Sequence, residues 1–65
     1  MLVRVSDPDR LADFILFLHN SGFPLARRMD DNVTKLHSDE EGKVQEVIDL
    51  WEAYSGTGAE IVEPD

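Results

Sequence analysis

Cysteine is absent from the 65 residues of the chain, and basic residues are few. Without cysteine there is no disulfide framework and no thiolate metal site, so a small core or an oligomer has to stabilise the fold. Only 6 Lys and Arg stand against 14 Asp and Glu, which gives a formal net charge of -8. Because phosphates repel such a charge, we expect no direct binding of nucleic acid or of an anionic membrane.

Long hydrophobic runs are also missing. The longest apolar stretch, residues 14–18, is far too short to cross a bilayer. The first residues show neither the basic region nor the apolar region of a secretory signal, so we expect a cytoplasmic protein. The length allows one domain, over residues 1–65, and the hydrophobic fraction of 42% is near that of ordinary globular chains.

Two segments carry the pattern of amphipathic helices. The first is expected to begin after Asp7, whose side chain can cap free amide groups, and to end near Asn20, where Gly22 supplies a left-handed stop. The second follows Ser38 and Glu41, which are spaced as a capping box, and is expected to run to about residue 54 or 55. Helical spacing predicts that each helix buries an apolar stripe, namely Leu11, Phe14, Ile15 and Leu18 in the first and Val44, Val47, Ile48 and Trp51 in the second.

Four strands are expected, over residues 2–5, 23–29, 33–37 and 59–63. The turn signal Asp30-Asp31-Asn32 joins the middle two, and its register is open because a two-residue and a three-residue loop both fit. The order is strand, helix, strand, strand, helix, strand. It predicts an α+β protein, a ferredoxin-like βαββαβ sandwich with a four-stranded antiparallel sheet and both helices on one face.

The two ends of the chain resemble a group of known proteins. Residues 1–9, MLVRVSDPD, and the block LWEA at 50–53, followed by a glycine-containing turn and EIVE at 60–63, are similar to short uncharacterised proteins of actinobacteria. The resemblance implies a stand-alone bacterial domain with the ferredoxin-like fold. It implies no catalytic or binding residue, since no chemistry is assigned to those proteins.

No motif in the sequence predicts an enzyme, a cofactor or a metal site. Residues 6–9 replace the cysteine pair by which ferredoxin-like domains bind soft metals. His37 beside Asp39 and Glu40 is a loose candidate for a divalent cation, and a solvated histidine beside a helix start is the alternative. Paired carboxylates lie at helix starts and at a turn, where capping explains them, and the expected central strands carry no aromatic residue on which a base could stack.

Of the six basic residues, four lie in the expected strands, namely Arg4, Arg27, Arg28 and Lys35. If both helices cover one face of the sheet, some of these basic side chains must emerge on the other face. Alternation places Arg4 on this face, because Val3 and Val5 face the helices. It also places Arg28 there, because the neighbouring Met29 faces the helices. We predict that the uncovered face is an association surface, and a solvated polar face is the alternative. The predicted surface consists of Leu2, Arg4, Ala26, Arg28, Glu60 and Val62.

These observations predict a small, non-enzymatic protein-interaction module that needs no cofactor. It would form a homodimer through its sheet or act as an adaptor for another protein. The alternative is an acidic inhibitor that imitates the charge of nucleic acid and blocks a DNA-binding protein. In that case the carboxylates of Glu41, Asp49 and Glu52 would follow a phosphate path.

Overall fold

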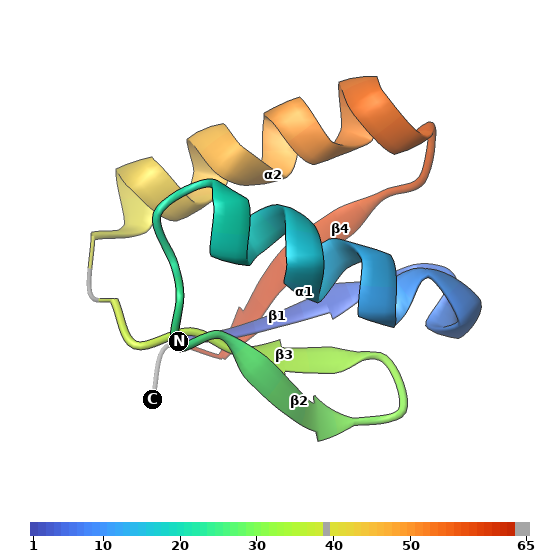
Figure 1. Ribbon diagram of the computed structural model, residues 1–65, viewed down its shortest axis with the longest axis horizontal. Coiled ribbons are helices and arrows are strands. Elements are labelled where there is room, and N and C mark those ends of the chain that lie inside the picture. The colour runs from blue at the N-terminus through green and yellow to red at the C-terminus, as the bar shows by residue number, and fades with distance from the viewer. Residues whose placement is uncertain (39, 64–65) are drawn as a thin grey trace.

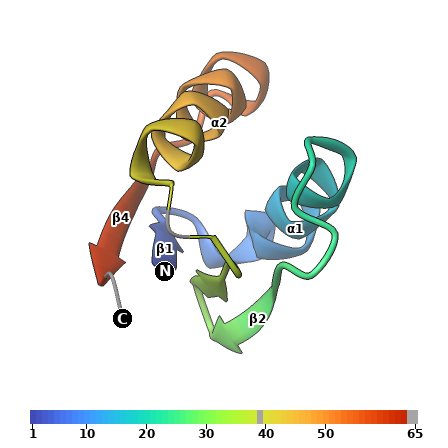
Figure 2. The ribbon, with the colours of Figure 1, turned by 90° about the vertical axis from the view of Figure 1, so that its left-hand side faces the viewer.

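Two helices pack against a four-stranded antiparallel sheet in the computed structural model, which describes residues 1–38 and 40–63 (Figure 1). The elements are β1 (Leu2–Val5), η1 (Pro8–Arg10), α1 (Leu11–Asn20), β2 (Arg27–Asp30), β3 (Val33–Lys35), α2 (Glu41–Ser55) and β4 (Ala59–Glu63). The strand order is β2-β3-β1-β4, and Figure 2 shows both helices on the same side of the sheet. The predicted α+β class and antiparallel sheet are therefore confirmed. Over the described residues, neither helix has the length and apolar character that crossing a membrane requires.

The first helical segment begins and ends where the sequence predicts. The Asp7 carboxylate accepts a hydrogen bond from the amide of Asp9 at 3.0 Å, and the single 3-10 turn η1 then leads into α1. At the other end Gly22 has a φ of 101°, a left-handed conformation that glycine adopts without steric cost. The amide of Phe23 donates to the carbonyl of Leu18 at 2.9 Å, which satisfies one of the free carbonyls of the last turn.

The strand expected over residues 23–29 is shorter than predicted, because β2 begins only at Arg27. Phe23 is hydrogen-bonded to the last turn of α1 through its amide. The amide of Ala26 donates to the carbonyl of Phe23 at 3.1 Å, which forms a tight turn. A segment that is strand-like in composition therefore closes the helix instead. The return strand, expected over residues 33–37, is also shorter and ends at Lys35.

The hairpin between β2 and β3 has a two-residue loop. Asp30 pairs with Val33 across it, which leaves Asp31 and Asn32 as the loop. The register shifts between Arg28 and Asp30, so β2 carries a bulge at this point. The structure thus resolves the alternative that the sequence left open.

The start of α2 differs from the predicted capping box. Ser38 Oγ accepts a hydrogen bond from the amide of Glu40 at 3.2 Å, and among the described residues no side chain caps the first turn of α2. The prediction of reciprocal hydrogen bonds between Ser38 and Glu41 is therefore wrong. The end of α2 is as predicted, since Gly56 adopts a left-handed φ of 76°. Asp39, which the sequence analysis named beside His37, lies outside the described residues.

The core lies between the helices and the covered face of the sheet. Both predicted helix stripes contribute to it, with the exception of Ile15, which is only half-buried against the core. Trp51 is fully buried and meets the ring of Phe14 edge-on, with 5.1 Å between the ring centroids. The buried apolar residues are Val3, Val5, Leu11, Phe14, Leu18, Ala26, Leu36, Val44, Val47, Ile48 and Trp51.

Candidate functional site

The face of the sheet that lies away from the helices is the surface that the sequence analysis singled out. In β1, Val3 and Val5 are fully buried under the helices, so Leu2 and Arg4 between them point to the opposite side. Pairing across the sheet then decides which other side chains share this side. We call it the open face, and it consists of Leu2, Arg4, Arg27, Asp30, Val33, Lys35, Glu60 and, by alternation within β4, Val62.

Strand β4 supplies one edge of the open face as predicted. Glu60 pairs with Arg4 of β1, and their side chains form an ion pair with 3.0 Å between Arg4 Nη2 and Glu60 Oε1. The two side chains are 49% and 65% exposed, so water screens the pair and it contributes only ~0–1 kcal/mol to stability. Val62 lies next to the β1–β4 bulge and is half-buried, whereas its neighbour Ile61 packs against the core.

Strands β2 and β3 supply the other edge, with a different set of residues from the one predicted. Lys35 pairs with Leu2, and Arg27 of β2 pairs with Lys35, so both cations belong to the open face. Val33 pairs with Arg4 and adds a half-buried apolar side chain. The sequence analysis had included Arg27 and Lys35 among the strand basic residues, but it could not place them without the hairpin register.

Ala26 and Arg28 do not lie on the open face, which corrects the prediction. Ala26 is only 5% exposed and belongs to the core. Arg28 pairs with Thr34, whose side chain is fully buried beneath the helices, so Arg28 starts from the helix-covered side. Its guanidinium reaches the carboxylate of Asp31 at 3.2 Å and the carbonyl of Asp30 at 3.3 Å. These bonds keep it at the hairpin end of the sheet.

Arg27 and Lys35 form a cross-strand pair of like charge. Directly paired residues of an antiparallel ladder have Cβ atoms ~5 Å apart, and two like charges at this separation destabilise the sheet. Within the described residues neither cation has a carboxylate within ion-pair distance, although 14 Asp and Glu are present in the chain. The end of the open face at Arg27 and Lys35 therefore carries a local positive charge on a protein whose net charge is -8, whereas Asp30 and Glu60 lie on the same face at the level of Val33 and Arg4.

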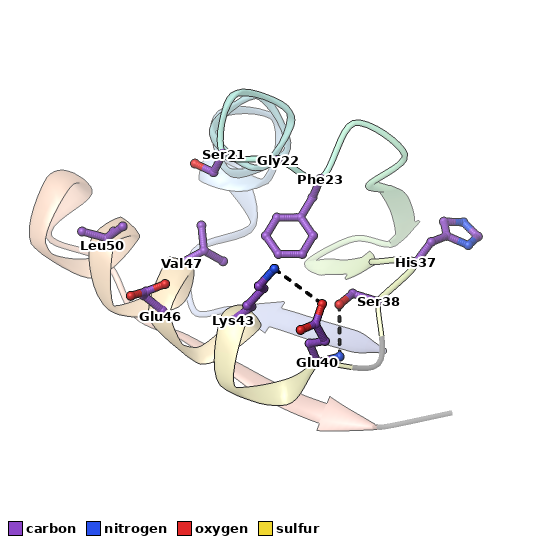
Figure 3. A pocket seen from close by; sticks show the side chains of 10 residues that line it. All are labelled: Ser21, Gly22, Phe23, His37, Ser38, Glu40, Lys43, Glu46, Val47 and Leu50. Atoms are coloured by element: carbon purple, nitrogen blue, oxygen red, sulfur yellow. Dashed lines mark hydrogen bonds and ion pairs between the residues drawn. The ribbon is translucent and has the colours of Figure 1, made fainter.

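The candidate cation site at His37 is not assembled by the described residues. The His37 ring points away from the Glu40 carboxylate, which is instead 3.6 Å from Lys43 Nζ (Figure 3). Asp39, its third proposed member, lies outside the described residues. No group of three or more His, Asp or Glu side chains able to hold a metal ion occurs in the part of the chain that the structure describes.

The carboxylates on the outer side of α2 are exposed, but two of them take part in local structure. Asp49 accepts a hydrogen bond from the side-chain amide of Gln45 at 3.1 Å. Glu52 Oε2 accepts one from the backbone amide of Ala59 at 3.3 Å and so ties the helix to the start of β4. Only Glu41 of the predicted phosphate-like path has no such bond among the described residues.

Comparison with known proteins adds no further assignment. No family model, no curated protein and no solved structure matches the chain. The similarity of residues 1–9 and 50–63 to short actinobacterial proteins therefore stays a prediction. Any function has to be argued from the open face and from the other surfaces of the molecule.

Proposed function

We propose that the protein is a non-enzymatic interaction module of the bacterial cytoplasm that forms a homodimer through its open face. The observation that carries the proposal is the pair of Arg27 and Lys35, which have no carboxylate within ion-pair distance among the described residues and lie towards the opposite edge of the sheet from β4, the strand that carries Glu60. A partner that brings a carboxylate to this pair relieves the repulsion. A second copy of the chain has such a carboxylate on the other edge of the same face.

Two-fold symmetry makes this arrangement self-complementary. The sheet order is β2-β3-β1-β4, so an axis that runs along the strands between two facing sheets places β2 of each copy over β4 of the other. Arg27 of one copy then lies over β4 of the other, two residues along the strands from the level of Glu60, and the contact occurs twice. The half-buried side chains of Leu2, Val33 and Val62 supply apolar area between these charged edges.

The finer fold assignment belongs to the same proposal. Read from the other edge, the sheet order is β4-β1-β3-β2, and the elements follow one another as strand, helix, strand, strand, helix, strand. This order and the placement of both helices on one side support a ferredoxin-like sandwich. In such an architecture the uncovered sheet face is the natural surface for a second layer, because a small domain gains stability when it covers that face.

The acidic inhibitor is the second candidate function. The exposed carboxylates of α2 and the net charge of -8 favour it. It is less well supported than the homodimer, because Asp49 and Glu52 already accept hydrogen bonds from their own chain and do not form a free row of charges.

Molar mass in solution, measured by sedimentation equilibrium at low and at moderate salt, tests the proposal. Copies with a charge of -8 repel one another at low salt, and salt that screens this repulsion also weakens the interface ion pairs. We therefore expect a dimer at both salt concentrations. A monomer that binds a cationic partner only at low salt would favour the acidic inhibitor.

The matched variants are Arg27→Glu and Arg10→Glu, which change the net charge equally. Arg10 is exposed on the helical side, where it pairs with Asp13 at 3.8 Å. Loss of a desolvated interface charge pair typically costs ~2–5 kcal/mol, so Arg27→Glu should raise the dimer dissociation constant by a factor of about ten or more. Arg4→Glu should act in the same direction, since it places a carboxylate beside Glu60. If Arg27→Glu and Arg10→Glu had equal effects, the change in net charge alone would explain both. Such a result would contradict the proposed interface.

A further inference from the structure

Exposed apolar side chains gather along the seam between α1 and α2. Leu16 of α1 is 59% exposed, and Leu50 and Tyr54 of α2 are 57% and 76% exposed. Single exposed leucines are ordinary on a protein surface, but apolar groups that flank one groove from both sides mark a contact site. This seam lies on the side of the molecule opposite to the open face, so the proposed homodimer does not cover it (Figure 2).

The seam is hollowed along its length. Near the start of α1 a hollow of about 260 Å³ is lined by residues of both helices, among them Leu16, Trp51 and Tyr54. The hollow drawn in Figure 3, of about 470 Å³, lies between the end of α1 and the first half of α2, with Leu50 as part of its wall. The two hollows share no lining residue, but residues that are consecutive in the chain line them at both helices, namely Asn20 and Ser21 at the end of α1 and Leu50 and Trp51 on α2. We call them together the interhelical groove.

Stacked aromatic rings form the floor of the groove near Tyr54. Phe17 is half-buried and stacks on the ring of Tyr54, with 5.6 Å between the centroids and 22° between the ring planes. The buried ring of Trp51 lies 5.5 Å from Phe17 and 6.2 Å from Tyr54, so the three rings form one cluster. Tyr54 is therefore held in place by packing although most of its surface is accessible. A side chain that docks beside it meets a preformed apolar wall.

The charges along the groove leave a negative excess. Both cations at its rim are already paired, Arg10 with Asp13 at 3.8 Å and Lys43 with Glu40 at 3.6 Å. Glu46 lines the groove and has no hydrogen bond or ion pair with another side chain of the described residues. With a net charge of -8 on the whole molecule, the groove suits a cationic occupant.

We propose that the interhelical groove binds an amphipathic helix of another protein, with apolar anchors on one face and Lys or Arg beside them. The α2 side of the groove, from Lys43 to Tyr54, is about 16 Å long, which corresponds to about three helical turns. Side chains rather than a sheet edge line the groove, so it offers apolar contacts to a helix and no backbone ladder to a strand. A third helix seated there would complete the helical layer.

Fluorescence anisotropy with a labelled peptide tests the proposal on the intact chain. The probe is a peptide of about four turns with leucine along one helical face and lysine elsewhere, compared with a scrambled peptide of the same composition. The amphipathic probe should bind the protein about tenfold more tightly than the scrambled probe, because only the former presents its anchors together.

Two pairs of variants locate the binding. Leu50→Ser should weaken binding of the amphipathic probe by a factor of about ten, whereas Leu25→Ser, which changes a 66% exposed leucine outside the groove, should leave it unchanged. Glu46→Lys should weaken binding severalfold and reduce its salt dependence. Glu41→Lys, an equal change of charge on the same helix outside the groove, should have a smaller effect. Circular dichroism of each variant verifies that the fold is intact.

Three results would overturn the proposal. Equal binding of the two peptides would mean that only overall charge attracts them. Equal effects of Leu50→Ser and Leu25→Ser would place the bound peptide elsewhere. Conversion of a dimer into a monomer by Leu50→Ser would assign the groove to a second copy of the chain, whereas the same conversion by Arg27→Glu alone leaves the groove free for a different partner.

Discussion

At the scale of single residues, two buried polar atoms lower the free energy of unfolding. Thr34 Oγ1 and Trp51 Nε1 are both buried without a hydrogen-bond partner among the described residues. An unsatisfied buried donor or acceptor costs ~1–3 kcal/mol, which is a large share of the stability of a small domain. The two side chains differ in how much packing they contribute. The Trp51 ring fills the centre of the core, whereas a methyl group would occupy the space of the Thr34 hydroxyl equally well.

Thr34→Val should therefore stabilise the protein. Valine keeps the shape and the strand preference of threonine and removes the unsatisfied hydroxyl, so we expect the free energy of unfolding in urea to rise by about 1 kcal/mol. Thr57→Val is the matched control, because the Thr57 hydroxyl lies 2.8 Å from Ser55 Oγ and its loss breaks a hydrogen bond. A decrease for Thr34→Val as large as that for Thr57→Val would mean that Thr34 Oγ1 has a partner after all.

Trp51→Ala should have the largest effect of any single truncation. Trp51 is fully buried and contacts the rings of Phe14 and Phe17, so its removal opens a cavity between the helices and the sheet. Such a change costs ~3–5 kcal/mol and can leave a domain of this size unfolded at room temperature. Leu50→Ala, at the adjacent and 57% exposed position, should lower the melting temperature by only a few degrees. A cooperative melting transition of Trp51→Ala close to that of Leu50→Ala would contradict the core assignment.

At the scale of elements, the helices could be predicted from the sequence and the second strand could not. Helical periodicity, the cap at Asp7 and the glycines after both helices are local signals, and the structure has both helix ends near the expected residues. β2 depends on its neighbours. Phe23 is apolar because it closes α1 against the core, and Leu25 is 66% exposed in a turn. The alternate apolar positions Phe23, Leu25 and Met29 therefore do not indicate a strand.

The dependence of β2 on its neighbours also explains which part of the candidate site could be predicted from the sequence. Leu2, Arg4 and Glu60 lie on β1 and β4, where burial of the intervening residues sets the alternation, and the structure places them on the open face. The bulge in β2 and the loop length together exchange Arg27 for Arg28. A one-residue change of register moves every side chain of a strand to the other face, so a hairpin of unknown loop length cannot be assigned from the sequence alone.

Gly42 in α2 and Gly56 directly after it should respond in opposite directions to the same substitution. Gly56 ends the helix with a φ of 76°, where a Cβ atom is strained, so Gly56→Ala should lower the free energy of unfolding by ~1 kcal/mol. Gly42 lies in the first turn of α2 at an ordinary φ, and nothing within 4 Å would meet an added Cβ atom. Gly42→Ala should therefore raise the free energy of unfolding by ~0.5 kcal/mol. A rise for Gly56→Ala as well would mean that the C-terminal turn of α2 relaxes to accept a side chain, and a fall for Gly42→Ala would contradict the open space around Gly42.

At the scale of the whole molecule, charge is distributed unevenly. Arg4, Arg27 and Lys35 lie on the open face together with Asp30 and Glu60, while on the helical side the first turns of η1 and α2 carry Asp9 and Glu41. These acids interact favourably with the positive ends of the helices, and salt weakens that interaction. Salt also weakens the mutual repulsion of the acids. The two effects have opposite signs, and the net charge of -8 decides between them.

Moderate salt should therefore raise the melting temperature. Favourable dipole interactions are confined to the few acids at helix starts, whereas repulsion acts among all 14 acids, so its screening dominates. The measurement is a thermal melt at fixed protein concentration in low and moderate sodium chloride, because self-association makes the melting temperature depend on concentration. The double variant Glu41→Gln with Glu46→Gln removes repulsion in advance and should show a smaller rise. If the melting temperature of the parent falls steadily as salt is added, attraction between unlike charges outweighs repulsion, and the folded state is held together by its ion pairs in spite of its net charge.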